Sequence, residues 1–293
     1  MRRRVVAAAF TVLFVTLGAS AACGNNSGVG SLRGRIVYDR CSVRSTSYFC
    51  VSDIYVMNGD GTGQRKLIRT RTRRDDQQDR DPVWSPNGRK IAFWRETTHR
   101  HGDEIRIVNA DGTGERRLAQ GVTPSWSPDG QHLVFQGRDG LFVIGANGLG
   151  LRRLTHGGGA PDWSPDGRLI VFIKFDGHHT PLRLIRSDGT GERLLTSSRT
   201  GRHPEWSPTG NRIVDSKWSR GFILNARGDL VRELDLPFYH GDPAWSPNGR
   251  QLIFSASGEN ELEFDVYVMN TDGTARNRLT RTRLDESGVD WTR

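Results

Sequence analysis

The chain has 293 residues, of which 35% are hydrophobic and 26% are charged, and its formal net charge at pH 7 is +9. This length allows one large domain or two small ones, and the 35 glycines and 8 tryptophans favour a turn-rich β protein over a helical bundle. Three of the positive charges lie in the first 22 residues, and most other arginines recur in phrases such as GERRL and GLRRL that are typical of a solvated outer strand, so nucleic acid is excluded as an expected partner.

Residues 1–22 have the layout of an export signal: three arginines, then an apolar run, then small residues. Ser20-Ala21-Ala22-Cys23 resembles a bacterial lipoprotein lipobox, and residues 23–33 are a polar, glycine-rich tether. Two outcomes remain open, lipidation of Cys23 or plain secretion after ordinary cleavage. Either way the mature chain is expected outside the cytoplasm, and a lipid anchor would be its only contact with a membrane.

Cys41 and Cys50 lie in one predicted hairpin loop. In an oxidising compartment a disulfide that closes so short a loop stabilises a fold by about 2.5 kcal/mol in the chain-entropy model. Such a bridge leaves Cys23 unpaired, as an acylated residue would be. The alternative is a pair of free thiols in the loop.

From residue 34 onward the sequence repeats itself. A tryptophan, followed in five of six cases by Ser-Pro and a turn, recurs at intervals of 37 to 46 residues, a period that is the size of one four-stranded propeller blade. DGTG-type turns and alternating strands such as RKIAF and QHLVF also occur six times each. The six tryptophans are Trp84, Trp126, Trp163, Trp206, Trp245 and Trp291.

Each part of the repeat has a physical role. In Trp84-Ser85-Pro86-Asn87-Gly88, proline ends a strand and fixes the first corner of a tight turn, and glycine accepts the positive φ that closes it. Tryptophan supplies an apolar face that fills the wedge between neighbouring sheets. One blade therefore has four strands, written A (PxWS), B (xIAF), C (IYVMN) and D (RxLT).

The series begins with a B strand at residues 34–38 and ends with an A strand at residues 289–291. Pairing of these two strands completes a sixth blade and closes the ring, which removes exposed sheet edges. The expected fold is therefore all-β: a six-bladed propeller of four-stranded antiparallel blades over residues 34–293. An open solenoid of the same hairpins is the alternative.

The phrases PxWSPDGxxIxF and IYVMNxDGTGxxRLT resemble the WD-like repeat of the C-terminal propeller of the TolB family, whose members are periplasmic components of the Tol-Pal system. The repeats are also similar to the propellers of prolyl oligopeptidase relatives. The resemblance covers residues 34–293 and implies a six-bladed propeller. No GxSxG nucleophile motif occurs in the sequence, so peptidase activity is not expected.

All the tight turns should share one face of the ring, and the loops of variable length should share the other. Binding is usually placed on variable loops of a rigid scaffold. We define these as the variable face; its loops are 39–53, 94–104, 174–181 and 255–265 between B and C strands, and 69–81, 196–203 and 282–289 between blades.

Polar residues gather where the A strands leave the variable face, near the expected axis. Such a mouth suits a polar ligand or a divalent ion, and solvated rim polarity is the alternative. The candidate binding residues are Asp81, His203, Tyr239, His240, Asp242 and Asp290, with Asp162 and Glu205 just before their tryptophans.

We expect an exported, monomeric propeller without a catalytic constellation, which binds a protein or another cell-envelope component through its variable face. The alternative is a metal-assisted saccharide lyase or hydrolase, because these repeats are also similar to those of oligogalacturonate lyase. No cofactor is expected for the binding protein, whereas the enzyme would need a divalent metal at the axial mouth.

Overall fold

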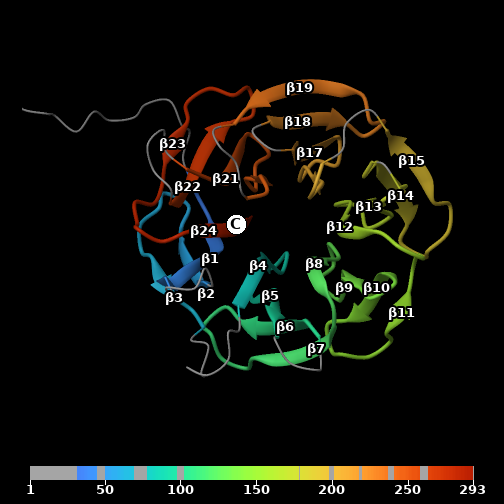
Figure 1. Ribbon diagram of the computed structural model, residues 1–293, viewed down its shortest axis with the longest axis horizontal. Coiled ribbons are helices and arrows are strands. Elements are labelled where there is room, and N and C mark those ends of the chain that lie inside the picture. Colours follow the sequence, from blue (N-terminus) through green and yellow to red (C-terminus); the bar gives the residue numbers. More distant parts are fainter. Residues whose placement is uncertain are drawn as a thin grey trace, which may run out of the picture.

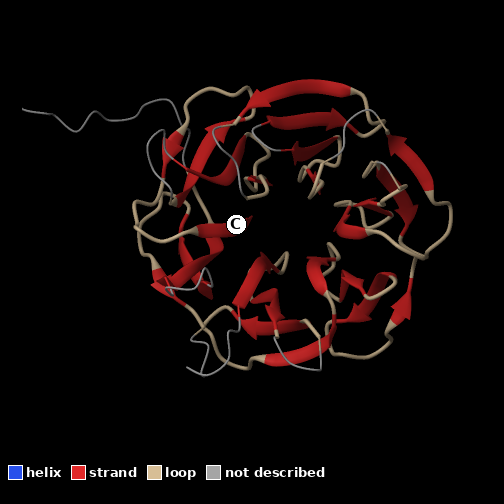
Figure 2. Cartoon of the chain, in the orientation of Figure 1, coloured by secondary structure: helices blue, strands red, loops and turns tan. Residues whose placement is uncertain are grey.

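The computed structural model describes residues 32–44, 50–68, 78–97, 102–177, 179–197, 201–217, 220–236, 241–257 and 263–292. Within these ranges the regular elements are 24 β-strands, which form six four-stranded antiparallel sheets around one axis (Figure 1, Figure 2). The same ranges contain no helix long and apolar enough to cross a membrane. The predicted six-bladed propeller is confirmed.

The strands of each blade are given from the axis outward. The first blade contains β24 (Glu286–Thr292), β1 (Arg35–Arg44), β2 (Cys50–Asn58) and β3 (Arg65–Lys66), and the second contains β4 (Gln78–Trp84), β5 (Lys90–Glu96), β6 (Glu104–Asn109) and β7 (Arg116–Gln120). The third contains β8 (Val122–Trp126), β9 (His132–Gly137), β10 (Gly140–Gly145) and β11 (Arg152–Arg153), and the fourth contains β12 (Gly159–Trp163), β13 (Leu169–Ile173), β14 (Leu182–Arg186) and β15 (Arg193–Thr196). The fifth contains β16 (Glu205–Trp206), β17 (Arg212–Lys217), β18 (Arg220–Asn225) and β19 (Leu230–Asp235), and the sixth contains β20 (Ala244–Trp245), β21 (Gln251–Ser257), β22 (Phe264–Asn270) and β23 (Asn277–Arg278).

The ring closes between the two ends of the propeller, as the sequence predicted. β24 pairs antiparallel with β1, and the register places Ile36 opposite Trp291. Trp291 is buried, and its indole N–H donates to the main-chain oxygen of Arg33 at 3.0 Å. Because β24 completes the blade that β1 begins, neither strand is left as an open edge.

The turn after each blade tryptophan is held by its own side chains. In the second blade, Ser85 accepts the main-chain N–H of Lys90 at 2.9 Å, and Asn87 accepts that of Arg89 at 3.0 Å. Gly88 has a φ of +63°, the left-handed conformation that glycine adopts without strain. The Ser-Pro-Asn-Gly phrase is therefore sufficient to specify this hairpin locally.

The hydrophobic core lies between neighbouring blades. Trp84 packs with Val37 and Ile54 of the first blade and with Ile91 and Phe93 of the second. The other blade tryptophans occupy corresponding clusters. The apolar surface that each tryptophan buries between two sheets joins one blade to the next.

Arginines of the outermost strands also link the blades. Arg152 donates to the main-chain oxygen of Ser187 at 2.7 Å, and Arg65 donates to that of Ala110 at 3.2 Å. Both acceptors lie in the tight turn of the following blade. The recurring arginines therefore contact main-chain oxygens of neighbouring blades, which explains their repetition without a nucleic-acid ligand.

The strands of the first blade extend farther than the sequence predicted. Residues 39–53 were expected to be a loop, but β1 continues to Arg44 and β2 begins at Cys50. The antiparallel ladder simply continues through polar residues, with a bulge between Cys41 and Val43. Cys50 lies two residues from Ser52, the partner of Cys41 in the ladder, but its side chain is outside the described part, so the bridge stays a prediction. Cys23, the expected export signal at residues 1–22 and all of the expected 23–33 tether except residues 32 and 33 also lie outside the described residues.

Candidate binding site at the propeller axis

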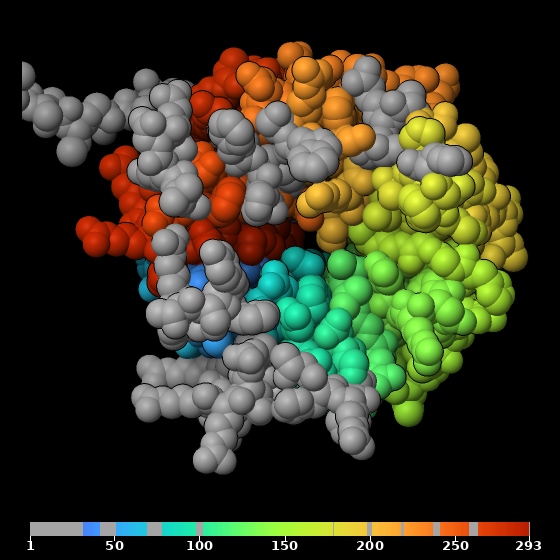
Figure 3. All heavy atoms as spheres, viewed as in Figure 1, coloured from blue at the N-terminus to red at the C-terminus, as the bar shows by residue number. Residues whose placement is uncertain are grey.

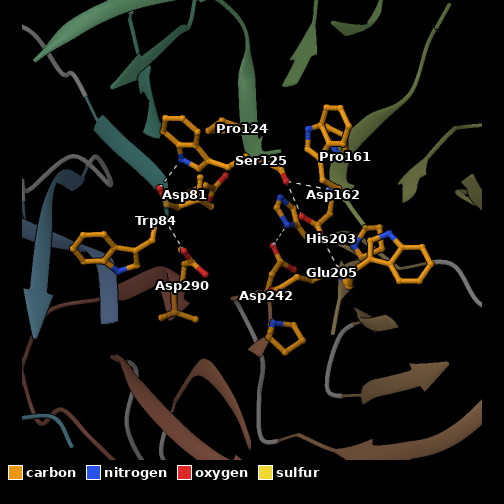
Figure 4. Close-up of a pocket in the computed structure, with 18 of the residues that line it drawn as sticks. Asp81, Trp84, Pro124, Ser125, Pro161, Asp162, His203, Glu205, Asp242 and Asp290 are labelled. Atoms are coloured by element: carbon orange, nitrogen blue, oxygen red, sulfur yellow. Dashed lines mark hydrogen bonds and ion pairs between the residues drawn. The ribbon is translucent and has the colours of Figure 1, made fainter. Parts of the chain in front are cut away.

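The innermost strands enclose a cavity of about 220 Å³ at the axis (Figure 3, Figure 4). Each blade contributes the same short stretch, which ends in its tryptophan. We name two sets of six residues by their place in this stretch. The mouth ring contains the residues three positions before each tryptophan, Asp81, Thr123, Ala160, His203, Asp242 and Gly288. The inner ring contains the residues directly before each tryptophan, Val83, Ser125, Asp162, Glu205, Ala244 and Asp290.

A β-bulge forms the mouth ring in four of the six blades. Asp81, Thr123, Ala160 and Gly288 have φ values between +45° and +52°. The register of their strands shifts at the same place, so that these residues have no partner in the ladder. A left-handed conformation costs a residue other than glycine about 1–2 kcal/mol. The repeated bulge turns this residue out of the sheet, and Asp81 and Gly288 thereby line the cavity.

The acids of the inner ring bind the main chain of the next blade. Asp290 accepts the N–H of Trp84 at 2.6 Å, Asp162 accepts that of Trp206 at 2.8 Å, and Glu205 accepts that of Trp245 at 3.1 Å. Asp162 also accepts the hydroxyl of Ser125 at 2.7 Å. These carboxylates link the innermost strands to one another.

Burial raises the pKa of each inner-ring acid. The pKa values of Asp162 and Asp290 rise to about 6, mainly because burial disfavours the charged form, although hydrogen bonds from tryptophan N–H groups oppose the shift. Burial and then the nearby carboxylates of Asp162 and Asp290 raise the pKa of Glu205 well above its ordinary value. The ionised form of these three acids is therefore disfavoured in the folded protein.

His203 and Asp242 form the polar side of the mouth ring (Figure 4). The Nδ1 atom of His203 lies 4.0 Å from a carboxylate oxygen of Asp242, and Ser216 donates to the other oxygen at 3.5 Å. Burial lowers the pKa of His203, but the carboxylates of Asp242, Asp81, Asp162 and Asp215 outweigh it, and the net shift is upward. The buried Nε2 atom of His203 has no hydrogen-bond partner among the described residues.

Asp81 occupies another part of the mouth ring, next to a second acid. The indole N–H of Trp94 donates to Asp81 at 2.7 Å. Asp39 lies behind Gly288, where a Cβ would collide with its Oδ1 atom. Burial and the charge of Asp81 raise the pKa of Asp39 to about 7. Glycine at position 288 is therefore required for the Asp39 carboxyl to approach the wall of the cavity.

Asp39 and Asp215 were not among the sequence-predicted site residues. Asp215 is buried beneath Gly201, and burial raises its pKa to about 7. It occupies a strand position at which the other five blades have a buried aromatic residue, Tyr38, Phe93, Phe135, Phe172 or Phe254. The sequence does show this departure when the six B-strand phrases are aligned. NRIVD ends in an acid, whereas phrases such as RKIAF and RLIVF end in an aromatic residue.

Four sequence-predicted residues, Asp81, His203, Asp242 and Asp290, line the same cavity. The other two, Tyr239 and His240, lie outside the described residues. In the described ranges, no group of three or more His, Cys, Asp or Glu side chains is arranged to hold a metal ion. What the site offers chemically is a set of carboxylates and one imidazole beneath a proline rim.

Comparison with known proteins identifies the family of the repeats. A family model for the TolB beta propeller domain matches residues 52–222, more than half of the chain. The chain is 38% identical over 76 residues to the Tol-Pal system protein TolB of Zymomonas mobilis, which covers 25% of this chain and 15% of that protein. It is 25% identical over 200 residues to the uncharacterized peptidase YuxL of Bacillus subtilis, which covers 64% of this chain and 24% of the relative.

Among solved structures, TolB from Acinetobacter baumannii has a TM-score of 0.75 with this chain at 19% sequence identity. The superposition covers 90% of this chain and 67% of that one. At this identity the likeness shows the fold alone. The chain spans less than a quarter of the length of the two curated relatives described above.

Proposed function

Because the chain belongs to the TolB β-propeller family, we propose that it is an exported binding protein without catalytic activity, whose axial cavity captures a protein or another component of the cell envelope. The lining of the cavity extends from the mouth ring to the turns that follow the blade tryptophans, at Pro86, Pro165 and Pro208. The propeller serves as a rigid scaffold, and the mouth ring selects the ligand.

The mouth ring is the observation that carries this proposal. The backbone bulges in the same way at Asp81, Thr123, Ala160 and Gly288, yet the side chains of these four positions differ, and the two remaining positions of the ring are His203 and Asp242. Residues that serve packing alone are repeated from blade to blade, as the tryptophans are. Side chains that vary from blade to blade around an axial cavity are expected where a ligand is recognised.

The envelope location is supported by the relatives named as Tol-Pal system proteins and by the export signal predicted at residues 1–22. We also propose that Cys23 is lipidated and that Cys41 and Cys50 form a disulfide. The intact mass of the mature chain tests both. It should equal residues 23–293 plus a lipid, and reduction should add two hydrogens. A lipid-free mass or a mass unchanged by reduction contradicts the corresponding proposal.

Capture experiments test the binding function. The full chain, immobilised through a C-terminal tag, is incubated with solubilised envelopes from the cells that produce it, and bound proteins are identified by mass spectrometry. We expect His203→Ala and Asp242→Ala to lose a ligand that the wild type retains. The matched control is Asp188→Asn in a tight turn, because Asn147 already occupies the equivalent position of the third blade. Equal capture by all the variants contradicts a binding role for the mouth ring.

A further inference from the structure

The fifth blade departs from the repeat at one buried position of its second strand. Five blades have an aromatic residue there, and the fifth has Asp215 in β17, which is 1% exposed. Burial of a carboxyl group costs free energy unless specific contacts offset it, and burial raises the pKa of Asp215 to about 7. The acid therefore needs an explanation other than packing.

The backbone around this position does not require an acid. Gly201, five residues before the blade tryptophan, lies against the Asp215 carboxylate, and an added Cβ would stand 1.8 Å from both of its oxygens. Gly121, the equivalent glycine of the third blade, lies in the same way against the ring of Phe135. The fifth blade thus has the glycine that makes room for an aromatic ring, and it holds a carboxylate there instead.

The carboxylate of Asp215 binds the main chain that leads into the mouth ring. It accepts the main-chain N–H of His203 and that of Ser216, the latter at 2.9 Å. The N–H of Arg202 also donates to the main-chain oxygen of Ser216, at 3.2 Å. Two consecutive residues of the segment that enters the mouth are thus bound to β17, and the second of them is bound through Asp215. An aromatic side chain has no oxygen to accept this N–H in the plane of a hydrogen bond.

The contact from Asp215 matters because the strand ladder does not place His203. In four blades a left-handed bulge turns the mouth residue out of the innermost strand, but His203 has no such φ value, and β16 begins only at Glu205. Asp242 of the sixth blade also lacks the bulge, and there Gly241 lies against the hydroxyl of Ser255. The position of His203 therefore depends on side-chain contacts to its main chain.

The imidazole of His203 in turn interacts with a second mouth residue. Its Nδ1 atom lies 4.0 Å from a carboxylate oxygen of Asp242 (Figure 4). Burial lowers the pKa of His203, but four carboxylates outweigh it; in decreasing order of effect they are those of Asp242, Asp81, Asp162 and Asp215. Because the interaction between two charges weakens with their separation, a displacement of the His203 main chain would reduce the effect of Asp242 on this pKa.

We propose that Asp215 is a positioning residue of the mouth ring: it fixes the main chain from Gly201 to His203 and thereby holds the His203 imidazole beside Asp242. Asp215 lies outside the described lining of the cavity, so it acts on a ligand only through His203. The inference rests on the proposed function for its consequence, since the mouth ring is the part of the cavity that selects the ligand there. Its first test needs no ligand.

A double-mutant cycle followed by NMR tests the proposal on the full chain. The pKa of the His203 imidazole is measured from its ring signals, which His203→Ala assigns. We expect Asp242→Asn to lower this pKa in the wild type, because it removes a carboxylate that stabilises the charged imidazole. In the Asp215→Phe background the same substitution should lower the pKa by at most about half as much, since the imidazole is no longer held beside Asp242. Equal effects in the two backgrounds overturn the proposal, whatever Asp215→Phe does to the pKa by itself.

A second background keeps the test valid if Asp215→Phe does not fold, which circular dichroism establishes. Asp215→Asn keeps the shape of the side chain but has one acceptor oxygen in place of two, so it cannot satisfy the N–H groups of His203 and Ser216 in the same way. The effect of Asp242→Asn on the pKa of His203 should be reduced in this background as well, and an undiminished effect contradicts the proposal. The matched control background is Asp188→Asn, in which Asp242→Asn should have its full effect.

Capture from solubilised envelopes separates this inference from the function on which it rests. A protein that the wild type retains and His203→Ala loses should be captured several-fold less by folded Asp215→Phe and normally by Asp188→Asn. Normal capture by Asp215→Phe contradicts the positioning role. If the cycle gives equal effects but capture depends on His203, the binding function stands and the positioning role is wrong. If the effects differ as expected but His203→Ala captures as much as the wild type, Asp215 positions His203 and the proposed binding function is wrong.

Discussion

The carboxylate of Asp290, in the last strand of the chain, accepts the main-chain N–H of Trp84 across 206 residues of sequence at 2.6 Å. Asp162 and Glu205 make the same contact to the tryptophans of their following blades. These bonds join the innermost strands, which share no backbone ladder with one another. The inner ring therefore contributes to ring closure as well as to the charge of the cavity.

Removal of this contact should destabilise the ring. We expect Asp290→Ala to lower the free energy of unfolding by about 1–3 kcal/mol, because it leaves a main-chain N–H without its acceptor. Asp290→Asn should cost less, since its side-chain oxygen can still accept the bond. Urea denaturation measures both. Asp139→Ala, which removes a carboxylate that is 55% exposed, is the control and should cost at most about 1 kcal/mol. A similar cost at Asp139 and Asp290 would contradict the structural role.

Trp291 should be essential for closure. It is 6% exposed and packs with Ile36 and Tyr38 of β1 and with Ala244 of the sixth blade. We expect Trp291→Ala to lower the free energy of unfolding by about 3–5 kcal/mol, as aromatic truncation in a core does, and Trp291→Phe to lower it less. Thermal and urea midpoints measure the loss. A change below 1 kcal/mol would mean that β24 contributes little to closure.

Stability should fall as the pH rises from about 4 to about 7. Burial raises the pKa values of Asp39 and Asp215 to about 7 and those of Asp162 and Asp290 to about 6. In this window the folded chain binds more protons than the unfolded chain, whose Asp groups titrate near their ordinary value. We therefore expect a higher melting temperature at pH 5 than at pH 8. The raised pKa of His203 acts in the same direction.

Asp215→Asn is the variant that checks this assignment, because it removes one of the titrating groups and keeps its shape. The difference in melting temperature between pH 5 and pH 8 should become smaller in this variant. A melting temperature that rises with pH in the wild type would show that other groups dominate the titration.

Metal removal should not change the stability of the described fold, because no metal-holding group is found among the described side chains. Metal analysis of the purified protein, followed by melting with and without a chelator, measures this. We expect no stoichiometric transition metal and equal melting temperatures. A bound metal whose removal lowers the melting temperature would favour the metal-assisted enzyme that the sequence left as an alternative.

The fold was predictable because its signals are local. The Trp-Ser-Pro-Asn/Asp-Gly phrase specifies both the turn and the tryptophan that packs between sheets within a few positions. The repeats begin with a B strand and end with an A strand, and this order predicted the pairing of β1 with β24. The convergence of Asp81, His203, Asp242 and Asp290 followed from their shared place before the A strands.

The structural role of Asp290 was not predictable in the same way. Its partner, Trp84, is distant in sequence, and the bond depends on how two blades meet. Asp39 was assigned to a loop, although the ladder of β1 continues through it. Asp215 is visible only when the repeats are aligned position by position. Contacts between blades, and the role of a residue that departs from the repeat, therefore became clear only from the three-dimensional structure.

The proline that follows the mouth ring in five blades has a consequence for how this propeller can diversify. Proline has no N–H, and where the strand bulges neither it nor the mouth residue takes part in the ladder. A new side chain at Asp81 or Thr123 would therefore disturb no backbone pairing. Selection can change these positions one blade at a time, and relatives with the same architecture can acquire different ligands through a few substitutions around the axis.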